Sequence, residues 1–148
     1  MDDHEAMGLA IDEARKAIAH GDVPVGAVAL RDGVVVASAH NERELRGDPT
    51  AHAELLLIQA LAASGGGWRQ HGVTMVVTLE PCPMCAGALW AAQVDRVVFG
   101  ADDPKAGAMG SLYNFASDPR LNHEVELAAR VRQDECAELL RGFFAAKR

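Results

Sequence analysis

Apolar residues near the start of the chain recur at the spacing of an α-helix. The positions that share one face are Met7, Ala10, Ile11, Ala14 and Ile18, separated by three or four residues. This period predicts an amphipathic helix. The His20-Gly21 pair that follows is a typical helix stop.

Two segments rich in Val and Ala come next and have the composition of β-strands. They cover residues 25–30 and 34–39 and are separated by Arg31-Asp32-Gly33. A short Asp-Gly turn between two apolar runs predicts an antiparallel hairpin.

The middle of the chain predicts two more helices with a strand between them. Asp48-Pro49-Thr50 offers a capping residue and a proline suited to a helix start, and the apolar run 53–63 then leads to a glycine triplet. Residues 73–79 are typical of a buried strand, and Pro81-Cys82-Pro83 opens a helix that continues to about Gln93.

The last third of the chain alternates between regular and irregular patterns. Residues 97–100 and 125–131 predict two strands, and residues 102–119, rich in Gly, Asp, Ser and Pro, predict a long functional loop. A final helix places apolar residues on one face: Cys136, Leu139, Leu140, Phe143 and Phe144.

This order of elements predicts an α/β fold, a three-layer α/β/α sandwich around a mixed five-stranded sheet. The 148 residues show no internal repeat and no linker, so we expect residues 1–148 to form a single domain. No run is long and apolar enough for a membrane span, and the acidic N-terminal segment is unlike a signal peptide. We therefore expect a cytoplasmic protein without a membrane partner.

The net charge of −7 provides no overall attraction to nucleic acid. Any RNA contact would need a local strip of basic residues, for which the candidates are Arg43, Arg46, Lys105, Lys147 and Arg148.

Two short segments carry residues of zinc chemistry, His52-Ala53-Glu54 and Cys82-Pro83-Met84-Cys85. Imidazole and thiolate are usual zinc ligands, and three protein ligands leave the fourth tetrahedral position for water, as in catalytic sites. We expect His52, Cys82 and Cys85 to bind one zinc ion per chain, in the first turns of two helices. His71 and His123 do not share a ligand spacing with these residues.

Glu54 is the candidate catalytic acid and base. Hydrolytic deamination removes a proton from water and delivers protons to the substrate, and one carboxylate beside the metal can perform both transfers. The combination of H-x-E with P-C-x-x-C is the known signature of zinc nucleobase deaminases, the cytidine deaminase-like superfamily.

Further segments resemble the bacterial tRNA-specific adenosine deaminases. They are residues 21–28, 48–54, 78–88, 98–101 and 107–112, together with Asn122-His123 and Phe143-Phe144. The resemblance implies a cytidine deaminase-like fold and hydrolysis of adenosine to inosine at the wobble position of a tRNA anticodon, by a homodimer. It also implies that Asn41, Ala53, Asp103, Lys105 and Phe144 contact the substrate. The sequence departs from the family at Ala106, where Thr is usual.

Two other functions remain open from the sequence. A deaminase of a free base or nucleoside, such as guanine or cytosine, would use the same metal chemistry, and the acidic net charge favours it. A non-catalytic zinc module that binds a partner would not need Glu54, and it would need a fourth ligand.

Overall fold

The computed structural model describes residues 1–147. The elements, in chain order, are α1 (Asp3–Ile18), β1 (Gly26–Arg31), β2 (Val34–His40), α2 (Arg43–Arg46), α3 (Ala53–Leu61), η1 (Ala62–Gly66), β3 (Val73–Leu79), α4 (Pro83–Ala91), β4 (Arg96–Ala101), β5 (Glu126–Ala128) and α5 (Gln133–Ala146). None of the helices within residues 1–147 is long and apolar enough to cross a membrane.

The five strands form one mixed sheet in the order β2-β1-β3-β4-β5. β1 pairs antiparallel with β2 and β3, whereas β3, β4 and β5 run parallel. The β1–β2 hairpin turns at Asp32 and Gly33, and both have positive φ, as the turn between right-twisted strands requires.

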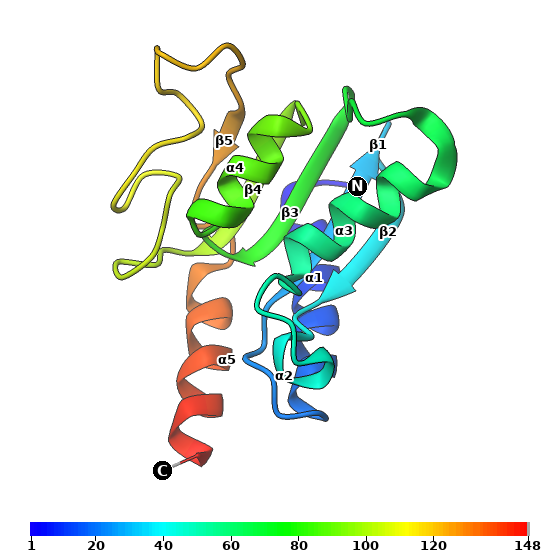
Figure 1. Ribbon diagram of the computed structural model, residues 1–148. Helices are drawn as coiled ribbons and strands as arrows, with labels where there is room; N and C mark the ends of the chain where they lie inside the picture. The colour runs from blue at the N-terminus through cyan, green and yellow to red at the C-terminus, as the bar shows by residue number, and fades with distance from the viewer. Residues whose placement is uncertain (148) are drawn as a thin grey trace.

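Helices cover both faces of the sheet and confirm the three-layer prediction (Figure 1). On one face α3 and α4 pack through Leu57 and Leu89 against Val77 and Phe99. On the other face α1 and α5 pack against Val28, Leu30, Val76 and Val98. Because side chains alternate along each strand, neighbouring residues such as Val76 and Val77 serve opposite cores.

The helix predicted to start just after Asp48 begins later, at Ala53, with His52 as its N-cap residue. The Asp48 carboxylate accepts hydrogen bonds from the backbone N–H and hydroxyl of Thr50, which forms a local turn instead of a helix. His52 therefore lies just before the first turn of α3, and Cys82 likewise lies just before that of α4, so both predicted first-turn positions were wrong by one residue.

Other boundaries also differ from the predictions. The strand predicted over 125–131 is confined to β5, because Arg130 and Arg132 have positive φ and end the extended conformation. The helix predicted to reach Gln93 ends at Ala91, and Gln93 likewise has positive φ. The short helix α2 was not predicted.

Candidate active site

Two helices begin at the same edge of the sheet, where β2 and β3 have their carboxyl ends on either side of β1. His52 is the N-cap residue of α3 and Cys82 is the N-cap residue of α4, and both have extended backbone angles. Neither side chain forms a capping hydrogen bond to its own helix. Both side chains are therefore available to a ligand that sits above the helix ends.

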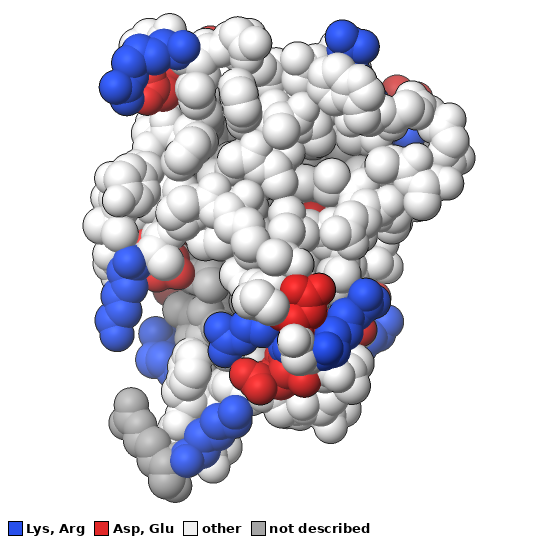
Figure 2. Space-filling model, in the orientation of Figure 1, with Lys and Arg blue, Asp and Glu red and all other residues white. Residues whose placement is uncertain are grey.

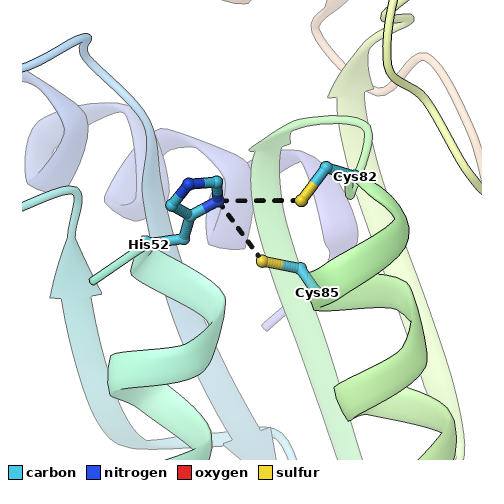
Figure 3. Close-up of side chains that lie close together, drawn as sticks. All are labelled: His52, Cys82 and Cys85. Atoms are coloured by element: carbon cyan, nitrogen blue, oxygen red, sulfur yellow. Dashed lines mark hydrogen bonds between the residues drawn. The ribbon is translucent and has the colours of Figure 1, made fainter. Parts of the chain in front are cut away.

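The side chains of His52, Cys82 and Cys85 converge on one point (Figure 3). His52 Nδ1 lies 3.7 Å from Cys82 Sγ and 3.6 Å from Cys85 Sγ. The three potential ligand atoms all lie within 4.8 Å of one another. Cys85 belongs to the first turn of α4 and is fully buried, whereas His52 and Cys82 are partly accessible.

These residues fit a zinc ion. In a tetrahedral site with Zn–S distances of about 2.3 Å and Zn–N distances of about 2.0–2.1 Å, ligand atoms lie roughly 3.5 Å apart. The observed separations of 3.6 and 3.7 Å agree with that spacing. No fourth His, Cys, Asp or Glu joins the group within residues 1–147. A three-ligand set is typical of catalytic rather than structural zinc sites.

The two thiols influence each other strongly. A hydrogen bond from Cys85, together with one from His52, lowers the pKa of Cys82 to about 4. The same hydrogen bond and burial raise the pKa of Cys85. The hydrogen bond to Cys82 also raises the pKa of His52. A cation between the sulfur atoms would favour both thiolates, since metal binding releases the protons of its ligands.

Glu54 lies in the first turn of α3 and is 4% exposed. Burial raises the pKa of its carboxyl group to about 7, and the negative charge on Cys82 acts in the same direction. A proton carrier with a pKa near neutrality can both accept and donate protons at physiological pH.

A pocket of about 190 Å³ opens in front of this cluster. This volume is below the roughly 300–1,000 Å³ of pockets for drug-sized ligands, so the pocket suits a small group such as one base. The residues that line it are Val23, Val25, Asn41, Arg43, His52, Ala53, Glu54, Leu79, Glu80, Cys82, Asp103 and Ala106.

Three of the predicted substrate contacts, Asn41, Ala53 and Asp103, line this pocket. The Asn41 amide donates to the carbonyl of Val23, and its oxygen accepts from the backbone N–H of Arg43. An amide has two N–H groups and two lone pairs on oxygen, so half of its capacity is left for a ligand.

The other two predicted contacts, Lys105 and Phe144, do not line the pocket. They line a separate groove of about 810 Å³ together with Leu140, Arg141, Ala145 and Lys147. Phe143 is buried and Phe144 is 47% exposed, so the two aromatic residues divide between core and surface. Arg148, the last candidate of the basic strip, lies outside the described residues.

Glu80 is a pocket residue that the sequence analysis did not single out. It is 2% exposed, and its carboxylate accepts hydrogen bonds from the loop that follows β4. The sequence signal was an acidic residue at the end of an apolar strand, directly before the Pro81-Cys82 segment.

Known proteins with similar sequences are zinc deaminases. Residues 1–101 match the cytidine and deoxycytidylate deaminase zinc-binding region. A tRNA-specific adenosine deaminase from Bacillus subtilis is 48% identical over 138 residues, which cover 93% of this chain and 86% of that protein.

Two solved structures are informative about the substrate class. One comes from a study of A-to-I editing by tRNA:A34 deaminases at the wobble position of transfer RNA, with 40% identity, a TM-score of 0.87, and coverage of 92% of this chain and 99% of the other. The second is a guanine deaminase from Bacillus subtilis, with 31% identity, a TM-score of 0.62, and coverage of 69% and 66%. The similarity to the guanine deaminase is lower in every one of these measures.

Proposed function

Since the chain belongs to the family of zinc-binding cytidine and deoxycytidylate deaminases and, within it, to the tRNA-specific adenosine deaminases, we propose that it hydrolyses adenosine to inosine at the wobble position of a tRNA anticodon. The observation that carries this function is the cluster of His52, Cys82 and Cys85 beside the buried carboxyl group of Glu54.

His52, Cys82 and Cys85 would hold one zinc ion per chain. When bound, zinc supplies a Lewis acid that lowers the pKa of a water molecule toward about 7. The two helix N-termini contribute positive partial charge at the same point and thereby stabilise the thiolates.

Glu54 moves the protons of the reaction. Its carboxylate takes a proton from the attacking water, whose oxygen forms a bond to C6 of adenine, and delivers a proton to the ring nitrogen N1. It then transfers the second proton to the exocyclic amine, the C6–N bond breaks, and ammonia leaves. A pKa of about 7 suits both directions of transfer, because neither protonation state is strongly favoured.

Groups on the pocket wall would bind and recognise the base. Asn41 would hydrogen-bond the base edge with the N–H and lone pair that the protein leaves unused. Ala53 also lines the pocket, next to Glu54, and would contact the ring. A single-stranded loop presents a base that is already partly unstacked, so little energy is needed to insert it.

The flanking nucleotides would occupy the groove that contains Lys105 and Phe144. Lys105, Arg141 and Lys147 bring positive charge to it, and none of its lining residues within 1–147 is acidic, although Arg141 forms an ion pair with Glu138 outside the groove. Figure 2 shows basic side chains at the lower end of this face, over α5 and α2, with acidic side chains among those near α2. Exposed Phe144 offers a stacking surface for a base. A basic groove of this kind is compatible with RNA binding despite the net charge of −7.

The active form would be a homodimer. Cys85, Ala86 and Leu89 are the buried residues of α4, which leaves apolar Trp90 and Ala91 toward other sides. A helix that is apolar all round has to be covered on several sides, and a second subunit can provide that cover. Sedimentation velocity at micromolar concentration should show a dimer, and a pure monomer would refute this assignment.

Residues 1–148 would function as one deaminase domain in the cytoplasm. The three cysteines of the chain are unpaired, as is usual in a compartment that keeps thiols reduced.

The decisive experiment is incubation of the purified protein with an anticodon stem-loop that carries adenosine at the wobble position. Inosine should form, and free adenine, guanine and cytosine should be converted far more slowly. Rapid conversion of guanine or cytosine without inosine in the RNA would instead favour a free-base deaminase.

A further inference from the structure

Glu80 occupies the junction between the metal-ligand segment and the loop that closes the pocket. It follows the last residue of β3 and precedes Pro81 and Cys82. Its backbone N–H donates to the carbonyl of Ala101 at the end of β4, so the main chain here is held by the neighbouring strand. Its side chain is 2% exposed and lines the same pocket as Glu54.

The carboxylate of Glu80 accepts four hydrogen bonds, all from one loop. Oε1 accepts from the backbone N–H of Asp103 at 3.0 Å and from the hydroxyl of Ser111. Oε2 accepts from the backbone N–H groups of Met109 at 3.1 Å and Ser111 at 3.0 Å. Three backbone N–H groups of residues 103–111 thus bind one buried anion in place of a partner in regular secondary structure.

The loop approaches the carboxylate so closely that a side chain would not fit between them. A Cβ atom at Gly107 would collide with the carboxyl group of Glu80. A second connection joins the same two segments, because the N–H of Ala108 donates to the carbonyl of Pro81 at 2.8 Å. The loop is therefore fixed directly to the segment that carries Cys82.

We propose that Glu80 is a positioning residue for substrate binding, which holds loop 103–111 as the wall of the pocket opposite His52 and Glu54. Asp103 and Ala106 of this loop line the pocket. Asp103 also accepts from the N–H groups of Lys105 and Ala106, so the anchor at Asp103 sets the direction of the turn that carries Lys105. Loss of the carboxylate would displace the residues that meet the nucleotide while His52, Cys82 and Cys85 remain in place.

The test is Glu80→Gln, which keeps the size of the side chain but places amide N–H donors against backbone N–H donors. This test rests on the proposed function, because its kinetic part uses the adenosine-containing anticodon stem-loop. KM should rise by about tenfold or more, while kcat falls by a smaller factor and zinc content stays equal to wild type. Ser111→Ala, which removes one donor of the four, should raise KM by a few-fold. Glu124→Gln, the same change at an exposed residue outside the pocket, is the matched control and should leave KM as in wild type.

A second measurement does not depend on activity. In Glu80→Gln the amides of Asp103, Met109 and Ser111 should exchange with deuterium faster than in wild type, while exchange in β3 and α1 stays unchanged. If the wild-type protein forms no inosine, the proposed function fails and the exchange data still test the anchor. If the wild type is active and KM is unchanged in both Glu80→Gln and Ser111→Ala, or if loop exchange is unchanged, the positioning role is wrong. Should Glu80→Gln not fold, Ser111→Ala provides both readouts.

Discussion

His52 and Cys82 hold the same position in two different helices and face each other across a gap of 3.7 Å between Nδ1 and Sγ. Each is an N-cap residue whose side chain is not used for capping. A metal bound between them would lie at the N-termini of two helices, where unpaired N–H groups favour anionic ligands. The site is therefore built at the starts of two helices, with Glu54 in the first turn of α3 and Cys85 in the first turn of α4.

Removal of one thiolate should remove the metal. Cys85→Ala is expected to lose most of the bound zinc, because two ligands cannot replace the buried third one. Cys136→Ala is the control, since Cys136 is also a buried free cysteine but lies on α5 and packs in the opposite core. Elemental analysis of both variants checks this, and full zinc occupancy in Cys85→Ala would refute the ligand assignment.

Replacement of Glu54 should separate metal binding from turnover. Glu54→Gln keeps the side-chain size and none of the metal ligands change, so zinc content and fold should be retained. Activity on the stem-loop should fall by about 10²–10⁴-fold or more, since one carboxylate serves several proton transfers. Near-normal activity in a zinc-loaded Glu54→Gln protein would exclude Glu54 from the mechanism.

Features with a local cause were predictable from the sequence. The Asp32-Gly33 turn needs only the positive φ of its two residues, and the hairpin has the predicted position. The grouping of His52, Cys82 and Cys85 was predictable because H-x-E combined with P-C-x-x-C is a known signature, and the structure brings the three side chains together. Helix α1 follows from its apolar period: Met7, Ala10, Ile11 and Ala14 are buried as predicted. Ile18, the last residue of the predicted face, is exposed, because it lies at the end of the helix.

Features with a non-local cause were not predictable. Helix α2 forms because the buried carboxylate of Asp22 accepts from the N–H groups of Glu44 and Leu45, about twenty residues away in the chain. No apolar periodicity in residues 43–46 predicts this helix. Glu80 is a similar case, since its four donors lie between 23 and 31 residues further on, in a segment without a regular pattern.

The packing of α1 on the sheet gives a prediction about stability. A Cβ atom at Gly26 of β1 would collide with backbone atoms of Ala10 and Ala14 in α1, which cannot move aside without a shift of the helix. Gly26→Ala should therefore lower the free energy of unfolding by about 1–3 kcal/mol or more. Gly142→Ala in α5 is the matched control, because open space surrounds that position. It should be stabilising by about 0.5–1 kcal/mol, since Ala is the better helix former. Urea denaturation of both variants measures the two effects.

The ion pair between Asp3 and Arg96 predicts that the stability of the folded protein depends on pH. The guanidinium donates to both carboxylate oxygens, at 2.7 and 2.6 Å, and this hydrogen bonding holds the pKa of Asp3 below its ordinary value of 3.8. A lowered pKa in the folded state means that the pair stabilises the protein above pH 3.8 and loses this effect as pH falls through the folded-state pKa.

Asp3→Asn should therefore be less stable than wild type at pH 7, and the difference should shrink as pH falls below 3.8 and through the folded-state pKa of Asp3. Both side chains are partly exposed, so solvent screening limits the loss to about 1 kcal/mol. Denaturant titrations at pH 7 and pH 3 check this. Asp32→Asn in the exposed hairpin turn is the control, and an equal pH dependence in both variants would contradict the assignment to the ion pair.

The groove beside α5 predicts how RNA binding responds to salt. Each phosphate contact releases counterions from the RNA, so affinity should fall as salt rises, and removal of one contact should reduce the slope of log K against log salt by roughly 1. Lys105→Ala and Arg141→Ala should each have this effect, because both residues line the groove. Phe144→Ala should instead weaken binding without a change of slope, since stacking on a base carries no net charge.

Arg31→Ala, at the opposite end of β1 from the pocket wall, is the control and should leave both affinity and slope unchanged. Filter binding of the stem-loop at several salt concentrations measures all four variants. If the slopes for Lys105→Ala, Arg141→Ala and wild type are identical, the RNA binds elsewhere on the surface. An affinity for the stem-loop that does not depend on salt concentration would favour a free base as the substrate.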